Sequence, residues 1–122
     1  MTETTVDLNN LADAPFGEQV LALRQLFGLS QKEFGKVLGG VSERTVSRWE
    51  QSETSEPHAQ NKVAVEALRT MAEALGDLFE PEIIKIWVDK ANPALGGERP
   101  RDYAKKPGGI YRMSELLGAN GR

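Results

Sequence analysis

The sequence predicts an all-α protein, and three observations lead to this fold class. Apolar residues recur at three- and four-residue intervals through most of the chain, which is the period of an amphipathic helix. Serine, glycine and proline stand at the borders of these segments, where they begin or end helices. No stretch shows the sustained apolar–polar alternation that a half-buried β-strand requires.

The first predicted helix runs from about residue 17 to residue 27. Its apolar residues share one face, at three- and four-residue spacing: Val20, Leu23, Leu26 and Phe27. Gly28 is placed to end the helix. The preceding residues 1–16 are polar and mildly acidic, and we expect a flexible N-terminus there.

The second predicted helix has a clear beginning. Ser30 is a good N-cap and Glu33 follows three residues later, which is the pattern of a capping box. Leu29 before the cap and Phe34 inside the helix form the matching hydrophobic staple. The pair Gly39-Gly40 ends the helix and predicts a tight turn.

The third predicted helix, from Glu43 to Gln51, has two chemically different faces. Ser42 is its N-cap. At about 100° per residue, one face carries polar side chains that can donate hydrogen bonds to an anion or to base edges. These are Arg44, Ser47, Arg48 and Gln51. Val46 and Trp49 lie on the opposite face and are expected in the core. Two short capped helices joined by a glycine turn make a helix-turn-helix candidate.

A polar linker, from Gln51 to Gln60, separates this unit from a longer predicted helix at residues 61–79. The apolar residues of that helix repeat as a seam of about two heptads: Ala64, Leu68, Met71, Leu75 and Leu78. The seam indicates either a buried core face or a dimer zipper. A short helix at residues 81–90 is apolar on most sides, and we expect it to be buried.

The last third of the chain is basic and interrupted by proline and glycine. From residue 92 onward, six Lys/Arg stand against three Asp/Glu, whereas the whole chain has a net charge of −3. We expect a helical turn near residues 101–105 and a final helix at residues 109–117. The two Gly-Gly pairs lack the lysine and Ser/Thr of a phosphate-binding loop and are interpreted as turns.

The composition excludes several kinds of site. The absence of cysteine excludes disulfides and thiolate zinc sites, and a single histidine, His58, excludes an imidazole cluster. His58 lies in the expected linker without a catalytic partner motif, so we predict no enzyme and no cofactor. No apolar run reaches the about 20 residues of a membrane span, no signal peptide is apparent, and the cytoplasm is the expected compartment.

The N-terminal half resembles the helix-turn-helix of the Xre and lambda-repressor family. The residues that carry the resemblance are Gln31, Phe34, Gly35, Gly39, Val41, Ser42, Thr45, Val46, Trp49 and Glu50. One departure is the Gly39-Gly40 pair, which is a residue longer than the family's usual single-glycine turn.

The resemblance implies a DNA-binding face. Glu43, Arg44 and Arg48 match the family's base-reading positions, and Gln31 matches a phosphate contact. The complete set expected to contact double-stranded operator DNA is Gln31, Ser42, Glu43, Arg44, Thr45, Ser47, Arg48 and Gln51. Glu43 would repel phosphate, so it either reads cytosine or acts as a specificity filter.

The C-terminal part, residues 86–117, is similar to the toxin-binding domain of the Xre/MbcA/ParS-like antitoxins. The matching residues are Trp87, Asn92, Pro93, Leu95, Gly97, Pro100, Gly108 or Gly109, and Leu116. This resemblance implies a dimeric antitoxin that binds its operator and neutralises a partner toxin, usually a RES-domain enzyme that destroys NAD. The expected toxin contacts are Arg99, Arg101, Tyr103, Tyr111, Arg112, Asn120 and Arg122.

The expected organisation is therefore a flexible segment (1–16), a helix-turn-helix domain (17–57) and a helical dimerisation and toxin-binding domain (58–122). Two alternatives remain open from the sequence. One is a stand-alone helix-turn-helix repressor whose C-terminal part only dimerises. The other is an adaptor that has lost DNA binding, which the acidic net charge keeps in consideration.

Overall fold

The structure, a computed structural model, describes residues 10–51 and 57–118, without the side chains of residues 117 and 118. Within these residues it is helical, and an isolated bridge between Asn92 and Glu98 is the one β-type pairing. The elements are η1 (Leu11–Asp13), α1 (Phe16–Leu26), α2 (Gln31–Val37), α3 (Glu43–Glu50), α4 (Ala59–Gly76), α5 (Pro81–Trp87), η2 (Pro93–Leu95), α6 (Pro100–Tyr103) and α7 (Gly109–Gly118). The predicted all-α fold is confirmed.

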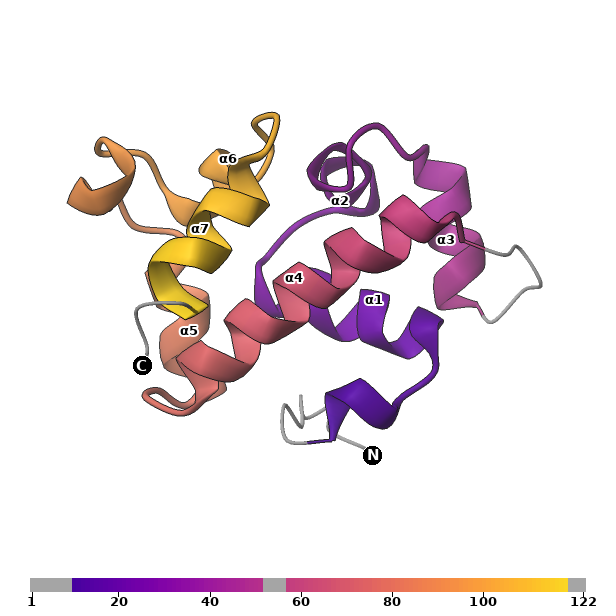
Figure 1. Cartoon of the computed structure of the whole chain (residues 1–122), viewed down its shortest axis with the longest axis horizontal. Coiled ribbons are helices and arrows are strands. Elements are labelled where there is room, and N and C mark those ends of the chain that lie inside the picture. The colour runs from indigo at the N-terminus through magenta and orange to yellow at the C-terminus, as the bar shows by residue number, and fades with distance from the viewer. Residues whose placement is uncertain (1–9, 52–56, 119–122) are drawn as a thin grey trace.

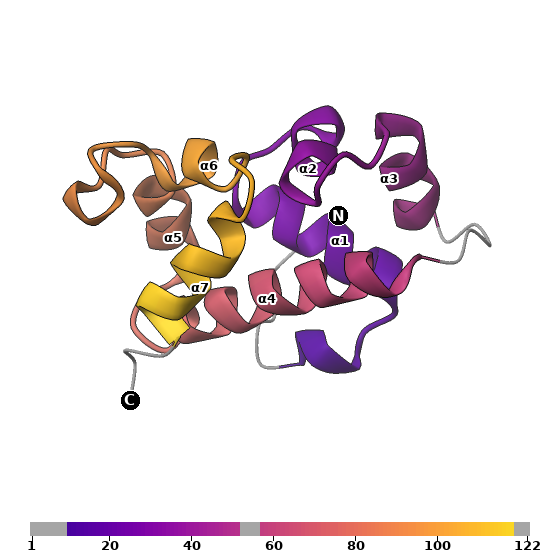
Figure 2. The ribbon, with the colours of Figure 1, turned by 45° about the horizontal axis from the view of Figure 1, so that its top comes forward.

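The long helix α4 joins the two ends of the molecule. Helices α1, α2 and α3 pack near its beginning, and α5, α6 and α7 gather near its end (Figure 1). The turned view shows the same division above α4 (Figure 2). Because α4 packs against both α1 and α7, the two ends of the molecule share one core.

Four residues of the predicted seam on α4 are buried in this core. Ala64, Leu68, Met71 and Leu75 are at most 3% exposed. They are covered by other helices of the same chain, so the alternative of a dimer zipper along this seam is wrong. The fifth seam residue, Leu78, is 74% exposed, because α4 already ends at Gly76.

Helix α5 is less buried than its composition predicted. Ile84 and Val88, four residues apart, point into the core. Ile83 and Ile86 remain about half exposed, so the expectation of a buried helix is wrong for this face. One face of a short helix is enough to anchor it, and no other described element covers the opposite face.

Two residues near the expected borders have structural roles that the sequence did not indicate. Leu11, placed in the expected flexible segment, is 5% exposed and belongs to the core. His58 is the N-cap residue of α4 rather than a linker residue. Its backbone N–H donates to Oδ1 of Asn61 at 3.3 Å, and Asn61 is 5% exposed.

The interrupted segment after α5 folds into a closed loop around Asn92. The Asn92 N–H donates to the carbonyl of Glu98 at 3.0 Å, and its side-chain Oδ1 accepts the N–H of Ala94 at 2.9 Å. The Gly97 N–H donates to the Asn92 carbonyl at 2.9 Å. The loop buries Leu95 and leads into α6, with Pro100 as its first residue. Helix α7 was predicted at its observed place.

Candidate nucleic-acid interface

Helices α2 and α3 begin as their capping residues predicted. The Ser30 hydroxyl accepts the N–H of Glu33 at 3.0 Å, and the Glu33 carboxylate accepts the N–H of Ser30 at 2.8 Å. Ser42 caps α3, where its hydroxyl accepts the N–H of Thr45 at 3.1 Å. These local bonds fix the first turn of each short helix.

The turn between α2 and α3 is held by the carbonyl of Gly35. The N–H groups of Gly40 and Val41 both donate to this carbonyl, at 2.9 and 3.0 Å. A Cβ on Gly35 would lie 1.9 Å from the Val41 carbonyl oxygen, so only glycine fits there. The longer turn therefore closes tightly, and its two glycines adopt φ values of 94° and 109°.

Helix α3 is anchored by its apolar face, as predicted. Val46 and Trp49 are buried, and the Trp49 ring meets Phe16 of α1 edge to face at 5.1 Å. A Cβ on Gly17 would lie 1.9 Å from the Trp49 carbonyl oxygen, so the backbones of α1 and α3 nearly touch. With this face fixed inward, the polar face of α3 must point outward.

A buried ion pair that the sequence analysis missed holds α1, α2 and α3 together. Arg24 donates two hydrogen bonds to the Glu50 carboxylate, at 2.6 and 3.0 Å, and Glu50 is 7% exposed. The side-chain amide of Gln31 donates to the same carboxylate at 3.0 Å. Glu50 belongs to the family motif, and its burial assigns it a structural role.

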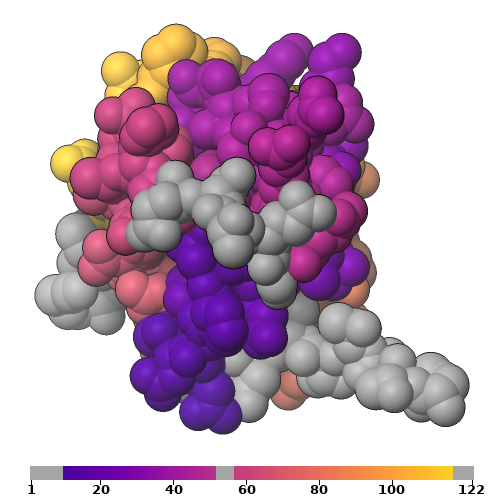
Figure 3. Space-filling view, turned by 90° about the vertical axis from the view of Figure 1, so that its right-hand side faces the viewer, coloured from indigo at the N-terminus to yellow at the C-terminus, as the bar shows by residue number. Residues whose placement is uncertain are grey.

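Five of the eight expected DNA contacts line one open hollow of about 520 Å³. They are Gln31, Glu43, Arg44, Ser47 and Arg48. The two arginine side chains are exposed, so their guanidinium groups can reach a ligand. Figure 3 looks at this end of the molecule, where α2 and α3 lie beside the beginning of α4. The hollow offers two cations and several hydrogen-bond donors to an anionic partner.

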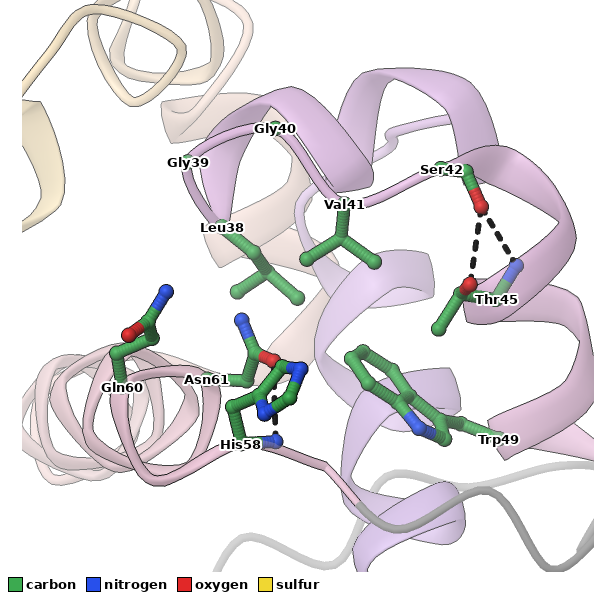
Figure 4. A pocket seen from close by; sticks show the side chains of 10 residues that line it. All are labelled: Leu38, Gly39, Gly40, Val41, Ser42, Thr45, Trp49, His58, Gln60 and Asn61. Atoms are coloured by element: carbon green, nitrogen blue, oxygen red, sulfur yellow. Dashed lines mark hydrogen bonds between the residues drawn. The ribbon is translucent and has the colours of Figure 1, made fainter.

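The other three expected DNA contacts lie differently. Ser42 and Thr45 line a second hollow of about 360 Å³, bounded by the α2–α3 turn and the first residues of α4 (Figure 4). The Ser42 hydroxyl also donates to the Thr45 hydroxyl at 2.9 Å. Gln51 is exposed and donates to the Ser47 hydroxyl at 3.1 Å, next to the first hollow.

Arg99, the N-cap residue of α6, and Arg101 in its first turn are expected toxin contacts that take part in ion pairs within the chain. Arg99 donates to Asp89 and Asp102, both at 2.7 Å. Hydrogen bonding to Arg99 lowers the pKa of the Asp102 carboxyl. Arg101 lies 3.5 Å from Glu33 and 3.6 Å from Asp89, so it connects α6 to α2 and to the turn after α5.

Among the remaining expected toxin contacts, Tyr103 is the last residue of α6, and Tyr111 and Arg112 belong to α7. Tyr103 is half-buried, and its hydroxyl accepts a hydrogen bond from Arg112 at 3.4 Å, which raises the pKa of that guanidinium. Tyr111 and Arg112 are exposed. Asn120 and Arg122 lie outside the described residues.

No metal site and no membrane-spanning segment were found in the part of the chain that the structure describes. Within it, no group of three His, Asp or Glu side chains could hold a metal ion. None of the described helices is both long enough and apolar enough to cross a bilayer.

Comparisons with known proteins agree with both halves of this architecture. Residues 20–78 match the helix-turn-helix family, and residues 74–120 match the antitoxin Xre/MbcA/ParS C-terminal toxin-binding domain. Neither is an enzyme family. No curated protein matches the chain.

A solved structure shares the fold. A chain in the crystal structure of the M. tuberculosis MbcT-MbcA toxin-antitoxin complex superposes with a TM-score of 0.61 at 24% identity, covering 88% of this chain and 95% of that one. The two family matches overlap at residues 74–78 and together run from residue 20 to residue 120. This chain therefore combines a helix-turn-helix domain with a C-terminal toxin-binding domain of the Xre/MbcA/ParS antitoxin family, in that order along the sequence.

Proposed function

We propose that this antitoxin acts in the cytoplasm as part of a type II toxin–antitoxin system. It neutralises its cognate toxin by direct binding and represses its own operon by binding operator DNA. The observation that supports operator binding is the open hollow on α3. There, the exposed side chains of Arg44 and Arg48 lie beside Gln31 and Ser47.

The polar face of α3 suits the major groove of DNA. An arginine can donate two hydrogen bonds to O6 and N7 of guanine, and such a pair contributes about 1–3 kcal/mol of discrimination. Glu43 lines the same hollow and can accept a hydrogen bond from N4 of cytosine. Gln31 is held at the edge of the hollow by Glu50, in a position suited to a phosphate.

The operator should be an inverted repeat read by a homodimer. A helix-turn-helix dimer inserts one recognition helix into each of two successive major grooves, about 34 Å apart. The net charge of −3 predicts modest non-specific affinity, since few phosphates are neutralised per subunit. The buried seam of α4 requires that the dimer use a different surface.

The proposal that this chain binds a toxin rests on the match of its C-terminal region to a toxin-binding domain family. A RES-domain enzyme that destroys NAD is the toxin class that the family resemblance favours. Neutralisation would work by obstruction, in which the antitoxin covers the substrate cleft of the toxin. Exposed Tyr111 and Arg112 on α7 remain proposed contacts, together with Asn120 and Arg122. Arg99 and Arg101 would contribute less, because their guanidinium groups are already paired.

The proposal is tested by co-expressing this chain with the product of the adjacent reading frame. Rescue of growth by the full chain, together with co-purification of the two proteins, is the expected result. Toxicity that the full chain does not relieve would contradict the proposal. Deletion of residues 92–122 is a poor test, because it removes Leu95, Ala104, Ile110 and Met113 from the shared core.

A further inference from the structure

Large apolar side chains are unusually exposed in the second half of the chain. Within the described residues, those with substantial exposure are Val63, Leu78, Phe79, Ile83, Ile86, Tyr111 and Leu116. All except Val63 fall inside residues 74–120, the segment that matches the toxin-binding domain. Contiguous exposed apolar residues in a monomer commonly mark a surface that another molecule covers.

Four of these residues lie close together in the chain, where α4 ends and α5 begins: Leu78, Phe79, Ile83 and Ile86. We call them the α4–α5 apolar surface. Ile83 and Ile86 are three residues apart and therefore share one side of α5. The inward side of α5 is already occupied by Ile84 and Val88, so folding of this chain does not require isoleucine at 83 or 86.

The charge around this surface is mainly negative. Between residues 76 and 88 the chain carries three carboxylates, Asp77, Glu80 and Glu82, and one cation, Lys85. Glu73 lies nearby, but its carboxylate is already paired with Arg69 at 3.3 Å. An apolar centre with an acidic rim is complementary to a partner that presents an apolar patch bordered by lysine or arginine.

The acidic rim argues against a second copy of this chain as the occupant. In a twofold dimer the same patch meets itself, so the rim carboxylates of one copy would face those of the other. Like charges brought together in this way repel, and partial desolvation increases the repulsion. A different protein with a basic rim does not carry this cost.

We propose that the α4–α5 apolar surface is the docking site for the toxin, and that the toxin presents a basic, apolar-centred patch to it. This inference rests on the proposed function, because it requires a toxin partner. The surface lies at the opposite end of α4 from α3 (Figures 1 and 2). Toxin and operator DNA can therefore bind the same antitoxin molecule at the same time.

The test measures the affinity of the full-length chain for the purified toxin encoded by the adjacent reading frame, using calorimetry. Two independent variants, Leu78→Glu and Ile86→Glu, place a charge in the surface. Val63→Glu is the matched control, because Val63 is 52% exposed and Ile86 is 51% exposed, but Val63 lies outside residues 74–120. Thermal unfolding of each variant checks that the fold is retained.

We expect each surface variant to bind the toxin at least about tenfold more weakly than wild type, as for a central interface residue. The Val63→Glu variant should bind within about twofold of wild type, and raising the salt concentration should slow association of wild type. If wild type binds the toxin and both folded surface variants bind equally well, the docking site is wrong. The docking site is also wrong if the only effect of the variants is that a dimer of this chain becomes monomeric.

A failure of the proposed function gives a different result. If wild type itself shows no affinity for the toxin, the antitoxin assignment fails, and this docking site fails with it. Binding by wild type that is lost in Leu78→Glu and Ile86→Glu, but retained in Val63→Glu, supports both.

Discussion

Glu33 of α2 accepts a hydrogen bond from Nζ of Lys105 at 2.7 Å, across 72 residues of sequence. The same carboxylate accepts the N–H of Ser30 in the capping box, and Arg101 lies 3.5 Å away. One side chain therefore both begins the first helix of the helix-turn-helix and ties that helix to the C-terminal region. This pair, with the shared core on α4, makes the two regions a single folded unit.

The Glu33–Lys105 contact predicts a specific pH dependence of stability. Hydrogen bonds from Lys105 and then from Ser30 lower the pKa of Glu33 from 4.5 to about 2. A carboxyl with a lowered folded-state pKa contributes stability that is present above its unfolded pKa, near 4.5, and is lost as pH falls towards about 2. The full shift would correspond to about 3 kcal/mol. Solvent screening of a side chain that is 31% exposed reduces the expected contribution to about 1 kcal/mol.

Urea unfolding of wild type and Glu33→Gln between pH 2 and pH 7 measures this contribution. We expect Glu33→Gln to be less stable by about 1 kcal/mol at pH 7, with the difference vanishing towards pH 2. Lys105→Met should reproduce the loss at pH 7 and add little to Glu33→Gln. A stability difference that stays constant over this pH range would refute the linkage.

The buried Arg24–Glu50 pair predicts a larger effect on stability. Replacing Glu50 by alanine leaves the Arg24 guanidinium, which is 19% exposed, without its carboxylate. Breaking such a pair should cost about 3 kcal/mol in the free energy of unfolding. Glu66→Ala is the control, because Glu66 is 67% exposed and lies 3.9 Å from Arg69. Its expected cost is below about 0.5 kcal/mol, and equal losses in the two variants would contradict the assignment.

The turn between α2 and α3 predicts that Gly35 tolerates no side chain. In Gly35→Ala the new Cβ would lie 1.9 Å from the Val41 carbonyl oxygen, and relieving this overlap should cost about 3 kcal/mol. Gly39→Ala tests backbone strain alone, because open space surrounds a Cβ at that position, where φ is 94°. It should cost about 1–2 kcal/mol. Thermal unfolding compares the two variants, and a Gly35→Ala protein as stable as wild type would disprove the close approach.

Local signals in the sequence predicted the helices and the two faces of α3. Ser30 with Glu33, and Ser42, begin helices through bonds that span three residues, so a short window contains all the information. The inward face of α3 followed from helical periodicity, and Val46 and Trp49 are buried as predicted. Four residues chosen by family resemblance, Gln31, Glu43, Arg44 and Arg48, lie around one hollow together with Ser47, which helical periodicity had placed on the same face.

Interactions between distant residues were not predictable in this way. Arg24 and Glu50 are 26 residues apart, and neither is distinguished by its neighbours in the sequence. Leu78 continues the heptad spacing of α4, but the helix ends at Gly76, so the side chain of Leu78 does not reach the core. Helix α5 is apolar on most sides, but in the described residues only Ile84, the adjoining Val88 and, in part, Trp87 pack against the core.

Operator binding tests the central claim most directly. The measurement is the affinity of Arg44→Ala/Arg48→Ala for a labelled fragment of the gene's own promoter, compared with a scrambled fragment. The matched control is Lys85→Ala/Lys90→Ala, which removes the same charge from exposed residues of the C-terminal region. We predict that the arginine variant loses at least about tenfold in affinity for the promoter fragment, while the lysine variant stays within about twofold of wild type. Unchanged, sequence-specific binding by the arginine variant would contradict the account.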